Sequence, residues 1–142
     1  MTYSRISLLL SLAMAGTVIA AEQLPPAAAK TGVTYDKDIL PMLKESCVGC
    51  HGEVKPKAGL RLDSLEGVLK GGHGGKEKVL TPGDSANSAI VIAAARIDPE
   101  TAMPPMKKNR PAQAGAPQRP PPKPLTPEQV GLIRAWIDQG AK

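Results

Sequence analysis

Aromatic side chains are nearly absent from this chain of 142 residues, which contains no phenylalanine, one tryptophan and two tyrosines. A domain of this size normally builds part of its core from aromatic side chains, because they bury large areas. Nucleic-acid-binding surfaces also combine basic with aromatic side chains, and the basic cluster of this sequence, at residues 107–124, has no aromatic residue. The sequence therefore argues against a nucleic-acid partner and leaves the core short of large apolar groups.

Cysteine is equally scarce, since the chain has two cysteines, Cys47 and Cys50, and His51 follows them directly. A structural zinc site needs four ligands, commonly cysteine and histidine, and the one other histidine, His73, leaves that set incomplete. A thiol-redox C-x-x-C pair is expected near a βαβ pattern, which the sequence lacks. A zinc site, a thiol-redox pair and a structural disulfide are the three alternatives for these cysteines. Each of them would make the chain a non-haem thiol or structural protein.

The C-x-x-C-H spacing of Cys47, Cys50 and His51 is instead typical of the attachment site of a c-type haem. Each cysteine can form a thioether with a haem vinyl group, and His51 then lies under the porphyrin as the proximal ligand of the iron. The haem would also supply the flat apolar bulk that the aromatic-poor core lacks. Because a tightly bound group is part of a protein's stability, we expect the haem-free polypeptide to be poorly folded.

Residues 1–21 have the pattern of a secretory signal peptide, with one basic residue, Arg5, then a short apolar stretch, and small residues at Ala20 and Ala21. The alternative, a membrane anchor, would need about 20 apolar residues, whereas this stretch is shorter and is interrupted by serines. We therefore expect cleavage after Ala20 or Ala21 and no stable membrane span in the mature protein. Bacteria attach c-type haem outside the cytoplasm, so the predicted location is the periplasm.

The remaining chain, of about 120 residues, suits a single domain. Residues 22–33 are rich in alanine and proline and are predicted to be a disordered start, which leaves the folded domain at 34–142. Within it, residues 107–124 form an insert rich in proline, lysine and arginine and without acidic residues. Such a composition is typical of an extended, polyproline-like surface loop, which would serve as a spacer or as a basic docking strip for an acidic redox partner.

Hydrophobic periodicity predicts four short helices and no strand, and therefore an all-α fold. The first helix is expected to have Asp38 as its N-cap, which leaves Pro41 in the first turn, and to deliver the cysteines. The second is expected at residues 65–70, between an N-cap at Ser64 and the helix-ending pair Gly71-Gly72.

The third helix is predicted to begin at Asp84 or Ser85 and to extend through an apolar row to Ile97. The fourth has the clearest start, because Thr126-Pro127-Glu128-Gln129 combines an N-cap, a proline at the first helical position and a glutamine three residues after the cap. Its buried stripe ends before Gly140, which stops the helix.

Several motifs follow one another along the chain between residues 34 and 141. They are Asp38-Ile39-Leu40-Pro41-Met42-Leu43, the C-x-x-C-H sequence, Gly59-Leu60-Arg61-Leu62-Asp63, Pro82-Gly83, Met103-Pro104-Pro105 and Leu132-Ile133-Arg134-Ala135-Trp136-Ile137-Asp138-Gln139-Gly140-Ala141. Together they resemble the planctomycete-type cytochrome c family. The resemblance implies a class I-like cytochrome c fold around one haem, in which the first and last helices cross and pack near the haem. Residues 107–124 depart from it, because the family's connection there is short.

The resemblance also implies that Met103 is the distal ligand of the iron. An iron with histidine and methionine ligands has both axial positions filled, which suits electron transfer rather than chemistry on a bound substrate. The prolines that follow Met103 would stiffen the loop that presents its sulfur. The alternatives are Met106, His73, Met42 or no distal ligand at all. We expect His73, which lies between glycines, to be exposed to solvent.

The sequence therefore predicts a periplasmic electron-transfer protein with one haem c, held by Cys47 and Cys50 and ligated by His51 and Met103, that exchanges electrons with redox partner proteins. It shows no recognisable acid–base or nucleophile motif, so we do not expect an enzyme. The alternative is a haem enzyme or gas sensor with an open sixth iron position, as would follow if Met103 did not reach the iron.

Overall fold

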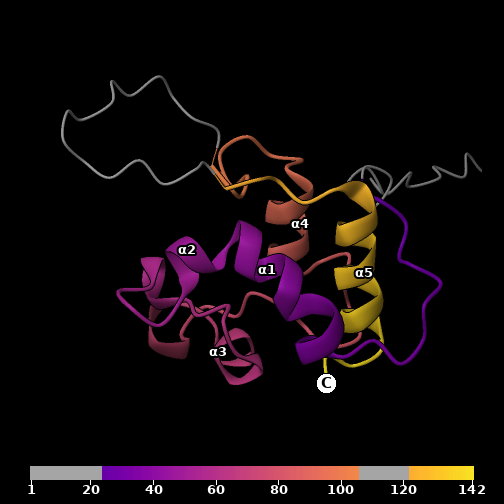
Figure 1. Cartoon of the computed structure of the whole chain (residues 1–142), viewed down its shortest axis with the longest axis horizontal. Coiled ribbons are helices and arrows are strands. Elements are labelled where there is room, and N and C mark those ends of the chain that lie inside the picture. Colours follow the sequence, from indigo (N-terminus) through magenta and orange to yellow (C-terminus); the bar gives the residue numbers. More distant parts are fainter. Residues whose placement is uncertain (1–23, 106–121) are drawn as a thin grey trace, which may run out of the picture.

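The computed structural model describes residues 24–105 and 122–142. These residues form short helices joined by turns and loops, with no strand and with isolated bridges between Gly72 and Glu77 and between Thr81 and Asp84. The elements, in chain order, are η2 (Tyr35–Ile39), α1 (Leu40–Ser46), α2 (Val48–His51), η3 (Lys57–Gly59), α3 (Leu65–Lys70), η4 (His73–Gly75), α4 (Ala89–Ala95) and α5 (Pro127–Asp138) (Figure 1). The predicted all-α fold is confirmed. The additional α-helix arises because the C-x-x-C-H motif forms a helical turn of its own.

Two predictions concern parts of the chain outside the described residues. They are the signal peptide at 1–21 and residues 107–121 of the proline-rich insert. Within residues 24–105 and 122–142, every helix is too short or too polar to cross a membrane.

The first helix begins earlier than predicted, at Tyr35, where the chain enters the π-helical turn η2 that leads directly into α1. Asp38 is therefore not the N-cap. Thr34 holds that position with extended backbone angles, and its N–H donates to the Asp38 carboxylate at 2.8 Å. The wide turn precedes Pro41, which has no N–H for an ordinary helical bond, and the N–H of Leu40 instead reaches the carbonyl of Tyr35.

The helix α3 begins and ends where the sequence predicts. The Ser64 hydroxyl accepts the N–H of Gly67 at 3.1 Å, which caps the first turn. Gly71 ends the helix with a φ of 85°, and a Cβ at this position would lie 2.1 Å from the carbonyl oxygen of Glu77. Glycine is therefore required here both for the backbone angle and for the close approach of the next loop.

The helix α5 also confirms its prediction. Thr126 and Gln129 form a complete capping box, with Pro127 in the first turn, and Gly140 follows the helix end with a φ of 98°. Its apolar stripe packs against α4 and against the η2 turn of the first helix (Figure 1). The first and last helices of the domain thus meet, as the family resemblance implies.

The helix α4 starts later than predicted, at Ala89, and ends at Ala95. Asp84 does not begin a helix, because its carboxylate accepts the N–H of Asn87 at 3.2 Å and forms a separate turn. Ser88 is at the N-cap position but does not cap, because its hydroxyl accepts the N–H of Thr81 at 3.0 Å and donates to the Asp84 carbonyl. Asp84 and Ser85, the predicted start, thus lie in the turn that precedes the helix.

The core is centred on two aromatic residues, Tyr35 and Trp136. The rings of Tyr35 and Trp136 have centroids 5.4 Å apart, and the two residues are 1% and 0% exposed. Each polar end has a partner, because the Tyr35 hydroxyl donates to the Leu62 carbonyl and Trp136 Nε1 donates to the Lys142 carbonyl, both at 3.0 Å. Aliphatic side chains from η2, α1, α4 and α5 complete this cluster. One aromatic pair thus organises a core that is otherwise aliphatic.

The expectation of a disordered start at 22–33 is wrong for residues 24–33, which lie along α5. Leu24 and Val33 are buried, and the N–H of Ala28 donates to the Gly131 carbonyl at 2.9 Å. A Cβ on Gly131 would lie 2.5 Å from the Pro26 carbonyl oxygen, so the glycine permits this contact. The segment is ordered because its partners are on α5, about a hundred positions later in the chain.

Candidate functional site

The C-x-x-C-H motif occupies the single turn α2, directly after α1. The N–H of Cys47 donates to the Leu43 carbonyl at 2.8 Å, and the Cys47 carbonyl then accepts the N–H groups of Cys50 at 3.0 Å and His51 at 2.9 Å. Backbone hydrogen bonds therefore fix all three predicted residues relative to one another. Both cysteines are free thiols, Cys47 half-buried and Cys50 exposed. Burial, with a smaller contribution from the neighbouring Cys50, raises the pKa of the Cys47 thiol to about 11.

The imidazole of His51 is partly buried, and its Nδ1 atom is buried without a hydrogen-bond partner. Burial lowers the pKa of His51, although the nearby backbone carbonyls of Leu60 and Lys57 act in the opposite direction. These carbonyls influence the ring but do not reach hydrogen-bonding geometry with Nδ1. The ring is consequently neutral at pH 7, which is the form of imidazole that ligates a metal.

The segment after the motif folds back over His51. The N–H of Leu62 donates to the His51 carbonyl at 2.7 Å, which brings η3 and the residues after it next to the α2 turn. Two non-glycine residues in this segment, Lys55 and Ala58, have positive φ angles of 52° and 54°. Val54 is 85% exposed, an unusual position for an apolar side chain, and it lies three positions after His51. The residues that directly follow the motif, from Val54 to Ala58, therefore lie outside the hydrophobic core.

Met103, the predicted distal ligand, comes from a separate loop between α4 and the proline-rich insert. Its neighbours Ala102 and Pro104 are buried, whereas Met103 is 39% exposed. The N–H of Met103 donates to the Ala93 carbonyl near the end of α4 at 2.8 Å, and the Met103–Pro104 peptide bond is cis. The loop is thus anchored on both sides of a methionine whose own side chain projects from the core.

The alternative ligands have different surroundings. Met42 is 7% exposed and packs within the hydrophobic core. The prediction that His73 is exposed is confirmed, and its Nε2 lies 3.6 Å from a carboxylate oxygen of Glu77. Met106 is outside the described residues. Of the methionines that the structure describes, Met103 is therefore the one with an exposed side chain on an anchored loop.

Some groups near His51 and Met103 are brought there only by the tertiary fold, and they were not predicted from the sequence. They include the carbonyls of Lys57 and Leu60 beside the His51 ring, and Arg96, whose guanidinium donates to the Pro104 carbonyl of the Met103 loop. No local pattern indicates either contributor, because arginine and backbone carbonyls occur throughout any chain.

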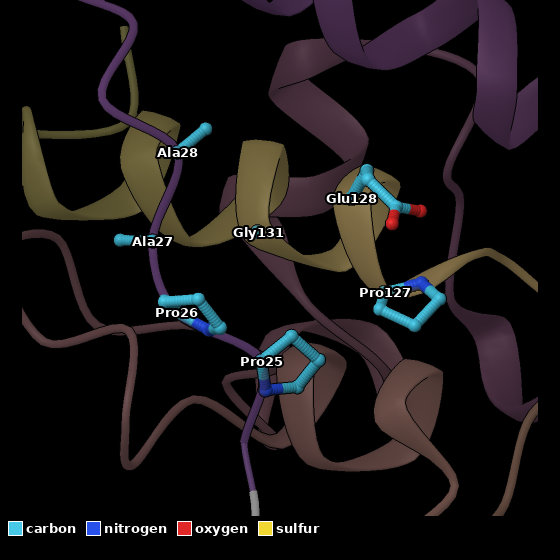
Figure 2. A pocket seen from close by; sticks show the side chains of 7 residues that line it. All are labelled: Pro25, Pro26, Ala27, Ala28, Pro127, Glu128 and Gly131. Atoms are coloured by element: carbon cyan, nitrogen blue, oxygen red, sulfur yellow. The ribbon is translucent and has the colours of Figure 1, made fainter.

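A groove of about 260 Å³ lies elsewhere, between the N-terminal segment and the start of α5 (Figure 2). Its lining is mostly apolar and comes from Pro25, Pro26, Ala27, Ala28, Pro127, Glu128 and Gly131. None of these residues belongs to the C-x-x-C-H turn or to the Met103 loop. The groove therefore takes no part in the candidate site.

Residues 47–107, which begin at the first cysteine of the motif and include Met103, match the family described as Planctomycete cytochrome C. This segment is a planctomycete cytochrome c domain. No curated protein and no solved structure matches the chain. Membership of the cytochrome c family implies haem c as the cofactor and indicates electron transfer as the class of function. Cytochromes of this type are typically electron carriers rather than enzymes, and they generally lie outside the cytoplasm.

The residues present fit a c-type haem. Two free thiols and a neutral imidazole lie on one turn, the Nδ1 of His51 is buried, and backbone carbonyls lie near its ring. In haem and metal sites, a ligating histidine commonly uses one ring nitrogen for the metal and the other for a backbone or carboxylate acceptor. The donor set, a pair of thiols with an adjacent imidazole, is also the set that covalent haem attachment requires.

Proposed function

We propose that this protein is a periplasmic electron-transfer cytochrome with one haem, attached through Cys47 and Cys50 and ligated by His51 and Met103. The observation that carries this proposal is the α2 turn, where backbone hydrogen bonds hold both free thiols and the imidazole together. The haem supplies one-electron exchange at its iron. The chain would hold it through Cys47 and Cys50, would ligate it through His51 and Met103, and would restrict access of other molecules.

His51 is suited to the proximal position because its ring is neutral and partly buried. The backbone carbonyls of Leu60 and Lys57 lie near the ring, and in the proposed site one of them would accept a hydrogen bond from Nδ1. Use of Nδ1 in this way leaves Nε2 for the iron and fixes the ring orientation. The Leu62 N–H bond to the His51 carbonyl further restrains the residue.

Met103 is suited to the distal position because its loop is fixed while its side chain remains partly exposed. A thioether ligand raises the reduction potential of a haem iron, and two filled axial positions disfavour binding of substrates and gases. Burial of Ala102 and Pro104 on either side limits how far the sulfur can move. A small change in ligand position between oxidation states is what rapid electron transfer needs.

The proposed location follows from the predicted signal peptide together with the family's general location outside the cytoplasm. We also propose an acidic redox partner that contacts the basic insert at residues 107–124, because long-range attraction between opposite charges speeds association.

The distal ligand provides the decisive test. A methionine sulfur on oxidised haem iron gives a weak far-red charge-transfer band, and it keeps carbon monoxide from the reduced iron. We expect the wild-type protein to show the band and to bind carbon monoxide slowly. Met103→Ala should abolish the band and open the iron to carbon monoxide.

Met42→Leu is the matched control, since it replaces a buried methionine by an apolar residue of similar volume. It should leave both the band and the slow carbon monoxide binding unchanged. Rapid carbon monoxide binding by the wild type would contradict the proposal and favour a gas sensor or haem enzyme with an open sixth position.

A further inference from the structure

The end of α4 and the Met103 loop are joined at two points. The Ala93 carbonyl, one of the last in α4, accepts the N–H of Arg96 at 3.2 Å and also the N–H of Met103 at 2.8 Å. The guanidinium of Arg96 donates from Nη1 to the carbonyl of Pro104. Met103 therefore lies between a hydrogen bond at its own N–H and a second one at the next residue, and both lead back to the same helix end.

Arg96 is an unexpected residue at this position. It is the C-cap of α4 and has left-handed backbone angles, with φ at 59° and ψ at 32°. A residue with a Cβ is strained there, and glycine is the usual choice at such helix ends. Helix termination alone would therefore be served better by glycine. The arginine side chain supplies something that glycine cannot, namely the charged donor for the Pro104 carbonyl.

The loop between Arg96 and Met103 contains a turn that is stabilised by Asp98. The Asp98 carboxylate accepts the N–H of Glu100 at 2.9 Å and the hydroxyl of Thr101 at 3.0 Å. Only the part after Ala102 leads directly toward the insert at residues 107–124. Among the described residues, the hydrogen bond from Arg96 to Pro104 is thus the last one on the Met103 loop before the insert begins.

We infer that Arg96 is a positioning residue for the distal ligand, and that its bond to the Pro104 carbonyl holds the Met103 loop so that the sulfur stays on the haem iron. This inference rests on the proposed function, specifically on Met103 as the ligand. A hydrogen bond from a charged donor is stronger than a neutral one, so its loss should increase loop opening substantially.

The test is the rate at which imidazole displaces the methionine from the oxidised holoprotein, followed by loss of the far-red band. At saturating imidazole this rate is limited by release of Met103. Arg96→Gly should exchange about tenfold faster than wild type or more, while its melting temperature changes little, because glycine relieves the strained backbone. Arg96→Gln should also exchange faster, and Arg96→Lys, which retains one charged donor, should give an intermediate rate.

Arg134→Gln is the matched control. Arg134 also donates a guanidinium hydrogen bond to a proline carbonyl, that of Pro25, but it does so on the N-terminal segment. Its exchange rate should equal that of wild type. A merely structural role for Arg96 would lower the melting temperature and leave the exchange rate unchanged.

Wild-type exchange rates in both Arg96→Gly and Arg96→Gln would overturn the inference. If the band is present in wild type and lost in Met103→Ala, that result would leave the ligand assignment intact. Absence of the band from wild type, or its persistence in Met103→Ala, would instead overturn the ligand assignment and the Arg96 inference together.

Discussion

Two sides of the molecule differ in how far their residues are buried. The α5 side comprises α5 and the aromatic pair, and the C-x-x-C-H side comprises α2, η3 and η4. On the α5 side, Tyr35 and Trp136 are almost completely buried, and α5 has six buried residues. On the C-x-x-C-H side, the short elements α2, η3 and η4 contain no buried residue, and Val54 is 85% exposed. The polypeptide thus provides its own core on one side and lacks one on the other.

This difference gives the haem a structural role in our account. Burial of apolar surface is the main favourable contribution to folding, and α2, η3 and η4 bury little of it against protein. A porphyrin attached at Cys47 and Cys50 would provide the missing apolar surface next to these elements. The expectation that the haem-free chain folds poorly should therefore apply mainly to the C-x-x-C-H side.

The largest effect should follow from preventing haem attachment with Cys47→Ala and Cys50→Ala together. In the haem-free variant, we expect backbone amides of α2 and η3 to exchange with solvent at rates near those of an unfolded chain, while amides of α5 exchange more slowly. Hydrogen exchange followed by mass spectrometry measures this directly. Equal exchange in α2 and α5 would show that the haem-free chain loses structure on both sides alike.

Trp136→Ala should destabilise the haem-loaded protein by about 3–5 kcal/mol, because it removes the largest side chain of the buried aromatic pair. Leu69→Ala, on the exposed face of α3, is the control and should cost well under about 1 kcal/mol. Urea unfolding of both variants gives the two values. Similar decreases in the free energy of unfolding for the two variants would mean that the aromatic pair is not the centre of the core.

A smaller effect is expected from Tyr35→Phe, which breaks a link between the two sides. The Tyr35 hydroxyl donates to the Leu62 carbonyl, and the N–H of Leu62 in turn donates to the His51 carbonyl. Loss of the hydroxyl leaves a buried carbonyl without its partner and should cost about 1–2 kcal/mol of unfolding free energy. The haem should stay attached and the spectrum should be unchanged, as absorption spectra and urea unfolding would show.

The smallest effect is a pH dependence that Tyr35 should introduce. Burial, together with the nearby Asp63 charge, raises the pKa of the Tyr35 hydroxyl above its ordinary value near 10. The unfolded chain therefore loses this proton at a lower pH than the folded protein, so the stabilisation is complete below about pH 10 and declines as pH rises further. The stability difference between wild type and Tyr35→Phe should shrink over that range. A constant difference between pH 8 and pH 11 would contradict the assignment.

The parts of the fold predicted correctly from the sequence are those decided by neighbouring residues. The capping box at Thr126 and Gln129 and the cap at Ser64 lie within three residues of the groups they bind, so local pattern was enough. The C-x-x-C-H motif is also local, and the match to the cytochrome c family begins at its first cysteine. Its separate helical turn was not predicted, and the roles of its three residues stay a prediction.

The incorrect predictions involve partners that are distant in sequence or compete for the same side chain. Asp84 and Ser85 were expected to begin the third helix, but Asp84 bonds to Asn87 in a separate turn and Ser85 bonds to Asp138 on α5, and residues 24–33 are ordered by contacts with α5. Arg96 could not be singled out because its partner, the Pro104 carbonyl, is brought near only by the fold. Hydrophobic pattern and capping signals contain no information about such contacts.

Covalent attachment of one haem by Cys47 and Cys50 can be measured from the intact mass of the protein under denaturing conditions. Protein produced in cells with a functioning haem-maturation system should have the mass of the processed polypeptide plus one haem. The variant with both cysteines changed to alanine should have the polypeptide mass alone. A wild-type mass without haem, from cells that mature another c-type cytochrome normally, would contradict the account.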